Sequence, residues 1–371
     1  MKYSFIVPAV AAMALQGVLA VAAEKDTNGS ASSEKWSPAA AAKYLDHRAE
    51  WWESWPNSQR DHGTVCVSCH TILPYVLSRS KLRAVLVEKD VTDQQRTILQ
   101  HVRKRVSQWA EMEPYYLDEK YGAGKSKESR STESVLNALV LASDAADQKH
   151  LDSLTRTAFN SAWELQIKSG DHTGAWLWQI FHLSPWEAAE SQYQGATFMA
   201  LAVAWAPESY RREPAIQGNL RLLRSYLKGE YDAQPLLNRI VLLWASAHLP
   251  GLLSNHEKRD LVDAVLKLQQ PDGGWSLASL GSWERSDHTP EERESDGYAT
   301  GLVTLAFKQA HIRHQEGWTK GRAWLESHQN KEDGSWPAYS LNKKRDTSTD
   351  IGKFMTDAAT GYAVLALEGN R

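Results

Sequence analysis

The chain has 371 residues, 42 Lys and Arg against 45 Asp and Glu, a formal net charge of -3 and a hydrophobic fraction of 42%. These values are typical of an ordinary globular protein and exclude a disordered or collagen-like chain. Because no long basic run is present, they also exclude nucleic acid as the main partner. The 16 Trp residues stand beside only 6 Phe and 2 Cys. An ordinary core does not need so many indoles, so we expect a repeated motif that uses Trp.

The first 23 residues have the pattern of a secretory signal peptide. Lys2 supplies a short positive region, residues 5–19 are mostly apolar, and the small residues 20–23 resemble a cleavage site. We therefore expect the mature chain to begin near Glu24.

An uncleaved membrane anchor is the alternative, but the apolar run is shorter than the ~20 residues of a membrane span. Pro8 and Gln16 also interrupt it. No later window is long and apolar enough to cross a bilayer, so no transmembrane segment is expected in the mature chain. Residues 24–37, rich in Ser, Lys, Glu and Asp, indicate a disordered leader. The predicted location is the periplasm or the cell exterior.

Both cysteines of the chain lie in one pentapeptide, Cys66-Val67-Ser68-Cys69-His70. Thiols one helical turn apart can add to the two vinyl groups of haem while the adjacent imidazole reaches the iron. The pentapeptide resembles the attachment site of c-type cytochromes. That resemblance implies a covalent haem c held by Cys66 and Cys69, with His70 as an iron ligand. It also agrees with export, because thioether attachment in those proteins takes place on the exported side of the bacterial inner membrane.

Two other uses of the cysteines remain open. Cys66 and Cys69 can form a local disulfide or a redox thiol pair, although the flanking sequence does not show the strand, motif and helix of a thioredoxin-type setting. They can also bind zinc together with His62 and His70, but nothing at the usual ligand spacing supports that site. Haem is the favoured interpretation.

A haem with His70 on one side has a sixth coordination position to fill. Met112, close to a predicted helix end, is our candidate, and a Met ligand opposite His would raise the reduction potential. The alternatives are His101, His62 or His47, or an open five-coordinate iron, and Met112 can equally be a core residue.

Residues 38–130 do not otherwise match a small cytochrome c. We predict a helical segment over 81–109 that would pack against the porphyrin. The aromatic cluster over 51–56 is suited to core packing, or to lining a haem edge or a hydrophobic ligand site. We interpret this part as the first helix pair or two of a barrel that carries the haem motif.

Residues 131–371 contain a repeat of alternating helix types. Five stretches with an Ala/Leu pattern at helical spacing predict closely packed inner helices. They are Glu133–Ala142, Gln192–Ala202, Leu236–Ala247, Ser295–Ala306 and Thr356–Leu367. More amphipathic second helices are predicted between them. They are Leu151–Ile167, Ala215–Leu227, Glu257–Gln269 and Trp318–Gln329.

Three of the amphipathic helices run into a turn that ends in Trp. The turns run from Gln166 to Trp176, from Gln269 to Trp275 and from Gln329 to Trp336. We expect the Gln to cap the last helical carbonyls, Asp-Gly to supply the tight turn and Trp to stack over the next helix end. The motif is predicted to be a structural staple.

The second turn, with Gln269, Gly273 and Trp275, matches Gln-x-x-x-Gly-x-Trp in full, and the other two match it loosely. This motif resembles the QW repeat of the squalene-hopene cyclase and oxidosqualene cyclase superfamily, over about residues 131–367. The resemblance implies an all-α fold, an (α/α) toroid whose number of helix pairs is close to six. Protein prenyltransferase β subunits and complement-type thioester domains share this architecture, so the architecture alone does not name a reaction.

The active-site motifs of these relatives are missing. No Asp-x-Asp-Asp acid of the cyclases is present, and the nearest candidate, Asp296, starts an inner helix and is better interpreted as its N-terminal cap. No Cys follows Cys69, which excludes both the zinc site of prenyltransferases and a thioester.

We therefore predict an exported c-type haem protein on a squalene-cyclase-like toroid. It would act in electron transfer or haem-dependent redox chemistry, with a redox partner or a small hydrophobic substrate in the barrel cavity. One alternative is an isoprenoid cyclase-like enzyme with an unorthodox acid, against which both export and the missing motif argue. The other is a non-catalytic module that binds a hydrophobic ligand.

Overall fold

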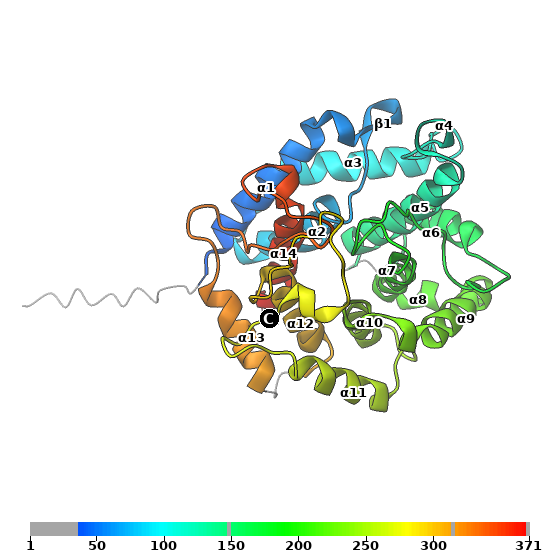
Figure 1. Cartoon of the computed structure of the whole chain (residues 1–371). Coiled ribbons are helices and arrows are strands. Elements are labelled where there is room, and N and C mark those ends of the chain that lie inside the picture. Colours follow the sequence, from blue (N-terminus) through cyan, green and yellow to red (C-terminus); the bar gives the residue numbers. More distant parts are fainter. Residues whose placement is uncertain (1–35, 147–149, 313–315, 369–371) are drawn as a thin grey trace, which may run out of the picture. The chain divides into compact units, whose positions relative to one another are not determined.

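Six helices of the described residues pack side by side into a closed inner ring, as seen down its axis in Figure 1. They are α2 (Ile72–Val85), α5 (Lys125–Asp144), α7 (Ser191–Trp205), α10 (Leu236–His248), α12 (Gly297–Gln309) and α14 (Phe354–Leu367). Each helix contacts the next in this order, and α14 contacts α2. Most of these helices are buried on nearly every side, which is why their sequences are apolar all round and rich in small residues. Five of the six contain the predicted Ala/Leu stretches; α2 is the inner helix that the sequence did not reveal.

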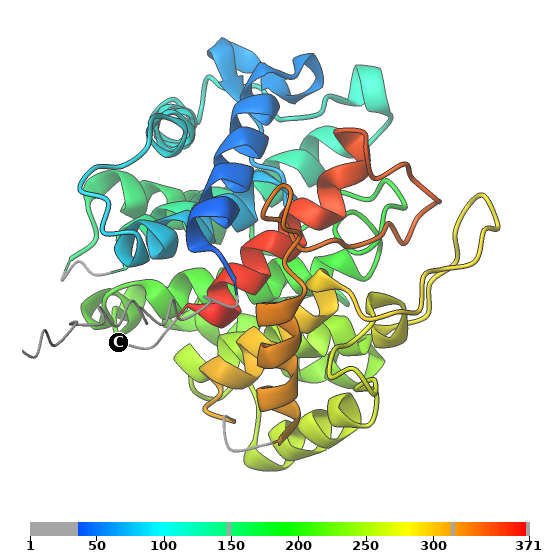
Figure 2. The same ribbon diagram turned by 90° about the vertical axis from the view of Figure 1, so that its left-hand side faces the viewer.

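Six further helices surround this ring and alternate with it along the chain. They are α1 (Pro38–Ser54), α3 (Asp93–Ser107), α6 (Ser153–Leu165), α9 (Pro214–Gly229), α11 (Asn255–Leu266) and α13 (Glu316–Ser327). Several show the expected amphipathic pattern, with buried residues on one face only. The side view in Figure 2 shows long loops extending from one end of the ring. The predicted all-α (α/α) toroid is confirmed.

Short elements complete the described part. Two are helices of one turn, α4 (Asp118–Tyr121) and α8 (Glu208–Arg211). Five are 3₁₀ helices: Pro56–Ser58, Asp61–Gly63, Tyr231–Ala233, Leu277–Leu280 and Ile351–Lys353. The strands β1 (Gln59–Arg60) and β2 (Thr64–Val65) pair antiparallel, with Gln59 opposite Val65 and Arg60 opposite Thr64.

The helix predicted over 81–109 is wrong as a single element. The helix α2 ends at Val85, and α3 begins at Asp93 after the side chain of Thr92 accepts a hydrogen bond from the Gln95 amide at 3.2 Å. An N-cap of this kind starts a new helix, and the chain turns from the inner to the outer ring at this point. The domain limit expected between residues 130 and 131 falls inside α5.

The three Gln…Trp turns share one geometry. The Gln269 side chain donates to the Gly273 carbonyl at 2.7 Å and to the Gly317 carbonyl of the next outer helix at 2.8 Å. The Trp275 indole donates to the Val265 carbonyl in the last turn of α11 at 2.9 Å. The predicted role of Gln as the cap of the preceding helix is therefore wrong, because the Trp indole bonds to the carbonyl in its last turn. The same bonds are made by Gln166 and Trp176 and by Gln329 and Trp336.

Close backbone approach closes the inner ring between its last and first helices. A Cβ added to Gly361 of α14 would lie 2.6 Å from the Cβ of Pro74 in α2. The outer ring closes at the same place, because the Gln329 side chain bonds to both the amide and the carbonyl of Ser37 ahead of α1. Ser37 and the helix α1 that follows it are thus part of the toroid.

The structure, a computed structural model, describes residues 36–146, 150–312 and 316–368. The predicted signal peptide, 1–23, and all but the last two residues of the predicted leader, 24–37, lie outside the described residues. No helix within the described ranges combines the length and the apolar character needed to cross a membrane.

Candidate functional site

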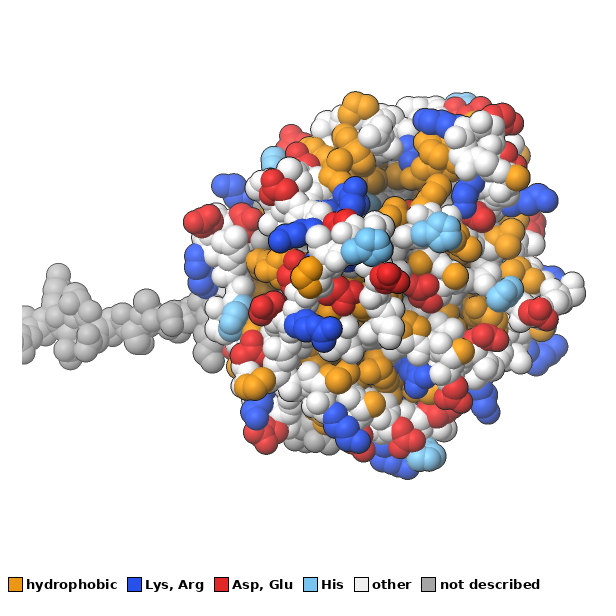
Figure 3. Space-filling model, in the orientation of Figure 1, with side chains coloured by type: hydrophobic (Ala, Val, Ile, Leu, Met, Phe, Trp, Pro, Cys, Tyr) orange, Lys and Arg blue, Asp and Glu red, His pale blue; other side chains and the backbone are white. Residues whose placement is uncertain are grey.

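A cavity of about 340 Å³ lies at one end of the inner ring, and Figure 3 shows a hollow with hydrophobic side chains on its walls. Its size is in the ~300–1,000 Å³ range of small-molecule sites. The walls come from four parts of the chain: the segment from α1 to α2, the start of α5 with the residues before it, the loop before α7, and the loop that leads into α14. Among the lining residues are Trp52, Trp55, Arg60, Cys66, Cys69, His70, Tyr115, Tyr116, Gln179, Trp186, Glu187, Arg345, Phe354 and Met355.

The Cys-x-x-Cys-His segment forms one wall of this cavity, between β2 and α2. The Ser68 hydroxyl accepts from the amides of Thr71 and Ile72, at 3.2 and 3.0 Å, and so caps the start of α2. The Trp52 indole donates to the Cys66 carbonyl at 2.9 Å. These bonds fix the segment, and Cys66 and Cys69 are both free thiols that line the cavity.

The His70 ring is oriented by a chain of hydrogen bonds that ends at a buried carboxylate. The Thr71 hydroxyl donates to Asp357 at 2.7 Å, so the 2.8 Å contact between the Thr71 oxygen and Nδ1 of His70 has the imidazole as donor. This assigns the proton to Nδ1 and leaves the lone pair of Nε2 free. Asp357 also accepts from Arg48 at 2.8 and 3.1 Å and from Tyr44 at 2.8 Å. Burial raises the pKa of Asp357, and the charge of Arg48 opposes that shift.

Aromatic rings hold the imidazole of His70 on three sides. The Phe354 ring stacks on it at 3.9 Å between centroids, and the rings of Trp52 and Trp186 lie at 5.1 and 5.5 Å. Burial, helped by the nearby charges of Arg48 and Arg345, lowers the pKa of His70 to about 3. The ring is therefore neutral at physiological pH, as a metal-binding imidazole must be.

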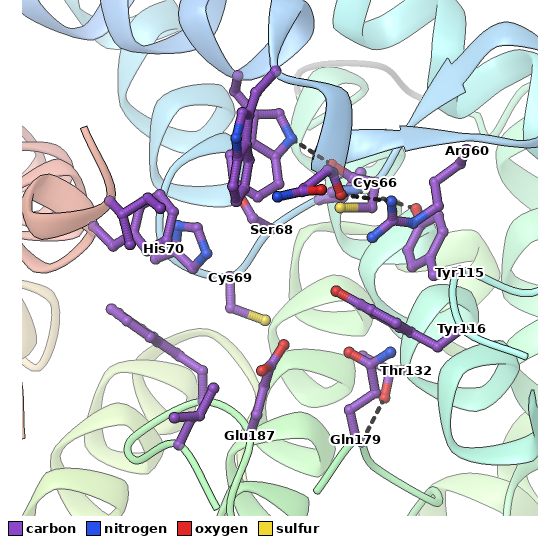
Figure 4. Close-up of a pocket in the computed structure, with 18 of the residues that line it drawn as sticks. Arg60, Cys66, Ser68, Cys69, His70, Tyr115, Tyr116, Thr132, Gln179 and Glu187 are labelled. Carbon is purple, nitrogen blue, oxygen red and sulfur yellow. Dashed lines mark hydrogen bonds between the residues drawn. The ribbon is translucent and has the colours of Figure 1, made fainter. Parts of the chain in front are cut away.

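Polar side chains form the wall opposite this segment, as Figure 4 shows. Arg60 from β1, Tyr116, Gln179 and Glu187 point toward the same space as Cys69. Burial raises the pKa of Glu187 to about 7, against the lowering effect of Arg60. Burial also raises the pKa of both cysteine thiols.

The candidate sixth ligand, Met112, does not line the cavity. Its side chain is 2% exposed and packs beside Arg105, with 4.0 Å between the sulfur and Nη1. His47, His62 and His101 are likewise absent from the cavity walls. The methionine that does line the cavity is Met355, at the start of α14.

Asp296 is the N-cap of α12, as the sequence indicated. One of its oxygens accepts from the amides of Tyr298 and Ala299, both at 2.9 Å, and the other accepts from the amide of Leu277. Burial raises its pKa to about 7. Asp296 does not line the cavity, so it is not placed to protonate a ligand there.

The zinc alternative finds no ligand set in the described part of the chain. No group of three or more His, Cys, Asp or Glu side chains there is arranged to hold a metal ion. His62, the proposed partner of His70, is 42% exposed and contacts Asp61 at 2.8 Å.

Sequence reasoning missed Arg60, Glu187 and Asp357. Asp357 carried a usable signal, since it is a single acid in the first turn of a helix whose other residues are apolar or small. Arg60 and Glu187 lie in short irregular segments where sequence pattern gives no guide to side-chain direction.

Comparison with solved structures finds the same architecture elsewhere. A glycosyl hydrolase family 88 protein from Bacteroides vulgatus superposes with a TM-score of 0.50 at 12% identity, over 88% of this chain and 97% of that chain. At this identity the likeness shows the α/α toroid fold alone. No protein-family model matches the sequence, and no curated protein matches it.

Proposed function

We propose that this chain is an exported c-type haem protein in which the cavity of an α/α toroid holds the haem. Cys66 and Cys69 would form the two thioether links, and Nε2 of His70 would bind the iron. The observation that carries the proposal is the state of His70. It is a neutral, cavity-lining imidazole with Nδ1–H already committed and Nε2 free, on the same wall as both thiols of the chain.

The donor set fits the chemistry of attachment. Addition of each S–H across a vinyl C=C forms one C–S bond and one C–H bond, so nothing leaves and no oxidant is needed. The thioethers that result are uncharged and suit the buried position of Cys66 and the half-buried position of Cys69. When bound, the haem would supply one-electron redox chemistry.

The surroundings of His70 support the same assignment. A ligating histidine usually donates its second N–H to a carboxylate or carbonyl, which fixes the ring and raises its basicity. Here Thr71 relays that bond to Asp357, and Arg48 holds the carboxylate in place. The flat aromatic faces of Trp52 and Trp186 are suited to contact a planar macrocycle.

A redox-active dithiol is less well supported. Reactive Cys-x-x-Cys pairs depend on a lowered thiol pKa. Burial raises the pKa of both Cys66 and Cys69, so each is a protonated thiol at neutral pH. The proposal leaves Met112 out of the ligand set, because its sulfur packs beside Arg105 rather than in the cavity.

The cyclase alternative lacks an acid, since Asp296 is committed to capping α12. The other interpretation is that the cavity binds a hydrophobic ligand and catalyses no reaction. One optical experiment separates this interpretation from the haem proposal.

The test is the absorption spectrum of the full chain, exported from a bacterial host that has cytochrome c maturation. We expect a Soret band in the purified wild type and its loss in the Cys66→Ser/Cys69→Ser variant. His70→Ala should change the spectrum of any haem that is attached, because the His70 nitrogen would no longer be available to the iron. Met112→Leu is the matched control and should leave the spectrum unchanged. A colourless wild type refutes the proposal and leaves the ligand-binding alternative.

A further inference from the structure

The cavity carries more positive than negative side chains. Arg60, Lys120 and Arg345 line it, and the one carboxyl group among the described lining residues is that of Glu187. None of the three cations forms an ion pair with a described residue. Lys120 is exposed, but Arg60 and Arg345 are half-buried. Burial of a charge is unfavourable without a partner, so this cavity is suited to a ligand that brings negative charge.

Arg60 is the cation held most firmly. Its Nη1 donates to the carbonyls of Asn57 and Gln59, at 2.8 and 2.7 Å. Its guanidinium carbon lies 4.8 Å from the centre of the Tyr116 ring. Its Nε is buried and has no hydrogen-bond partner among the described residues. The guanidinium is thus held against the backbone and the Tyr116 ring at the cavity wall (Figure 4).

A second unpartnered donor lies on the same wall. The Gln179 side chain is 5% exposed, and its Nε2 is buried without a described partner. The backbone of Gln179 is held by a 3.0 Å bond from its amide to the Thr132 hydroxyl. A buried amide N–H without a partner is unfavourable, so this group too has a donor available for an acceptor on a ligand.

We propose that Arg60 and Gln179 form a carboxylate-binding subsite in the cavity, facing the Cys66–His70 wall. A carboxylate matches the planar fork of Arg and leaves an oxygen for the amide. The aromatic rings of Tyr115, Tyr116 and Trp186 favour a carboxylate joined to a flat apolar group. Two sources share this chemistry: a propionate of an attached haem, which rests on the proposed function, and a free aromatic acid, which does not.

The experiment uses benzoate as the probe and calorimetric titration of the full chain. Haem-free wild type should bind benzoate, and Arg60→Gln should weaken binding by about 10- to 100-fold, as expected for lost charge-assisted hydrogen bonds. Arg60→Lys keeps the charge but not the fork, so it should fall between the two and carries the test if Arg60→Gln does not fold.

Arg239→Gln is the matched control. Arg239 also packs over a tyrosine, 4.9 Å from the ring centre of Tyr231, and also donates to backbone carbonyls, but it lies outside the cavity. This variant should bind benzoate like the wild type. Equal affinity of Arg60→Gln and the wild type, or no binding by the wild type, overturns the inference.

A haem-loaded sample separates the two sources. If a propionate occupies the subsite, attached haem should abolish benzoate binding. If the subsite serves a free acid, benzoate should bind with and without haem. Should haem never attach, the proposed function fails while the haem-free titration still decides the subsite.

Discussion

Replacing Arg48 with Met should be among the most damaging single changes outside the apolar core. Arg48 of α1 is 1% exposed and pairs with the fully buried Asp357 of α14. The substitution leaves Asp357 with only the hydroxyls of Tyr44 and Thr71 as donors. Removal of one partner of a buried ion pair typically costs about 3–5 kcal/mol. Because two donors remain, we expect about 3 kcal/mol at pH 7.

The assay is urea unfolding of the haem-free chain, with Arg156→Met as the control. Arg156 makes two 2.8 Å bonds to Glu213, but the two side chains are 43% and 32% exposed. Exposed pairs of this kind contribute at most about 1 kcal/mol. A loss for Arg48→Met no larger than that of the control would refute the assigned role of the buried pair.

The loss of stability in Arg48→Met should also depend on pH. Burial raises the pKa of Asp357, and Arg48 opposes this shift. Without Arg48 the folded-state pKa rises further above the unfolded value, so the native variant binds more protons than its unfolded chain. Its stability then falls as pH rises from about 4 through that folded-state pKa. The deficit relative to wild type should be smaller at pH 5 than at pH 7, and a constant deficit would contradict the argument.

Three further changes test the fold and the cavity by unfolding measurements on the haem-free chain. Gly361→Ala should destabilise the fold by about 1–3 kcal/mol, because the added Cβ would lie 2.6 Å from the Cβ of Pro74. Gly229→Ala is the control and should be neutral or slightly stabilising, because its Cβ would meet no atom within 4 Å. Equal changes in stability for the two variants would refute the close approach of α14 and α2. Trp275→Phe should cost about 1–3 kcal/mol, since the change removes the indole bond to the Val265 carbonyl and replaces a fully buried ring by a smaller one, and no measurable loss would contradict the staple role. Burial raises the pKa of Glu187 to about 7, so its contribution to stability is greatest below about pH 4.5 and falls as pH rises toward 7. Glu187→Gln should remove this pH-dependent part of the stability. Identical profiles of stability against pH for the variant and the wild type would disprove the role of Glu187.

The parts of the fold that follow from local pattern were predictable. The Ala/Leu stretches identified five inner helices because an inner helix is buried on all sides and packs closely only with small residues. The helix α2 escaped notice because Pro74 and Arg79 break that pattern. Pro74 lies in the first turn, where its missing N–H is no loss, and Arg79 is neutralised by Asp46 and Glu88.

The residues of the candidate site were likewise predictable only where the local sequence carries the signal. Cys66, Cys69 and His70 were visible because their spacing along the chain is itself the signal, and the structure places all three at one cavity. Met112 was chosen by its place in the sequence, which does not determine which side chains meet in space. Asp357 was missed for that reason, since its partner Thr71 is 286 residues away.

Arg60 and Glu187 depend on the conformation of irregular segments. Arg60 reaches the cavity from a two-residue strand, and Glu187 follows a compact loop closed by its own bond to Leu183. No periodic pattern in the sequence determines where such side chains point, so their meeting at one cavity is visible only in the folded ring.

The central claim, covalent haem at Cys66 and Cys69, is tested most directly by the mass of the peptide that contains residues 66–70. The full chain is exported from a host with cytochrome c maturation and digested without reducing agent. We predict that this peptide carries the added mass of one haem, with neither thiol open to alkylation, and that Met112→Leu gives the same peptide mass. A peptide of unmodified mass, whether its thiols are free or joined in a disulfide, would contradict the account.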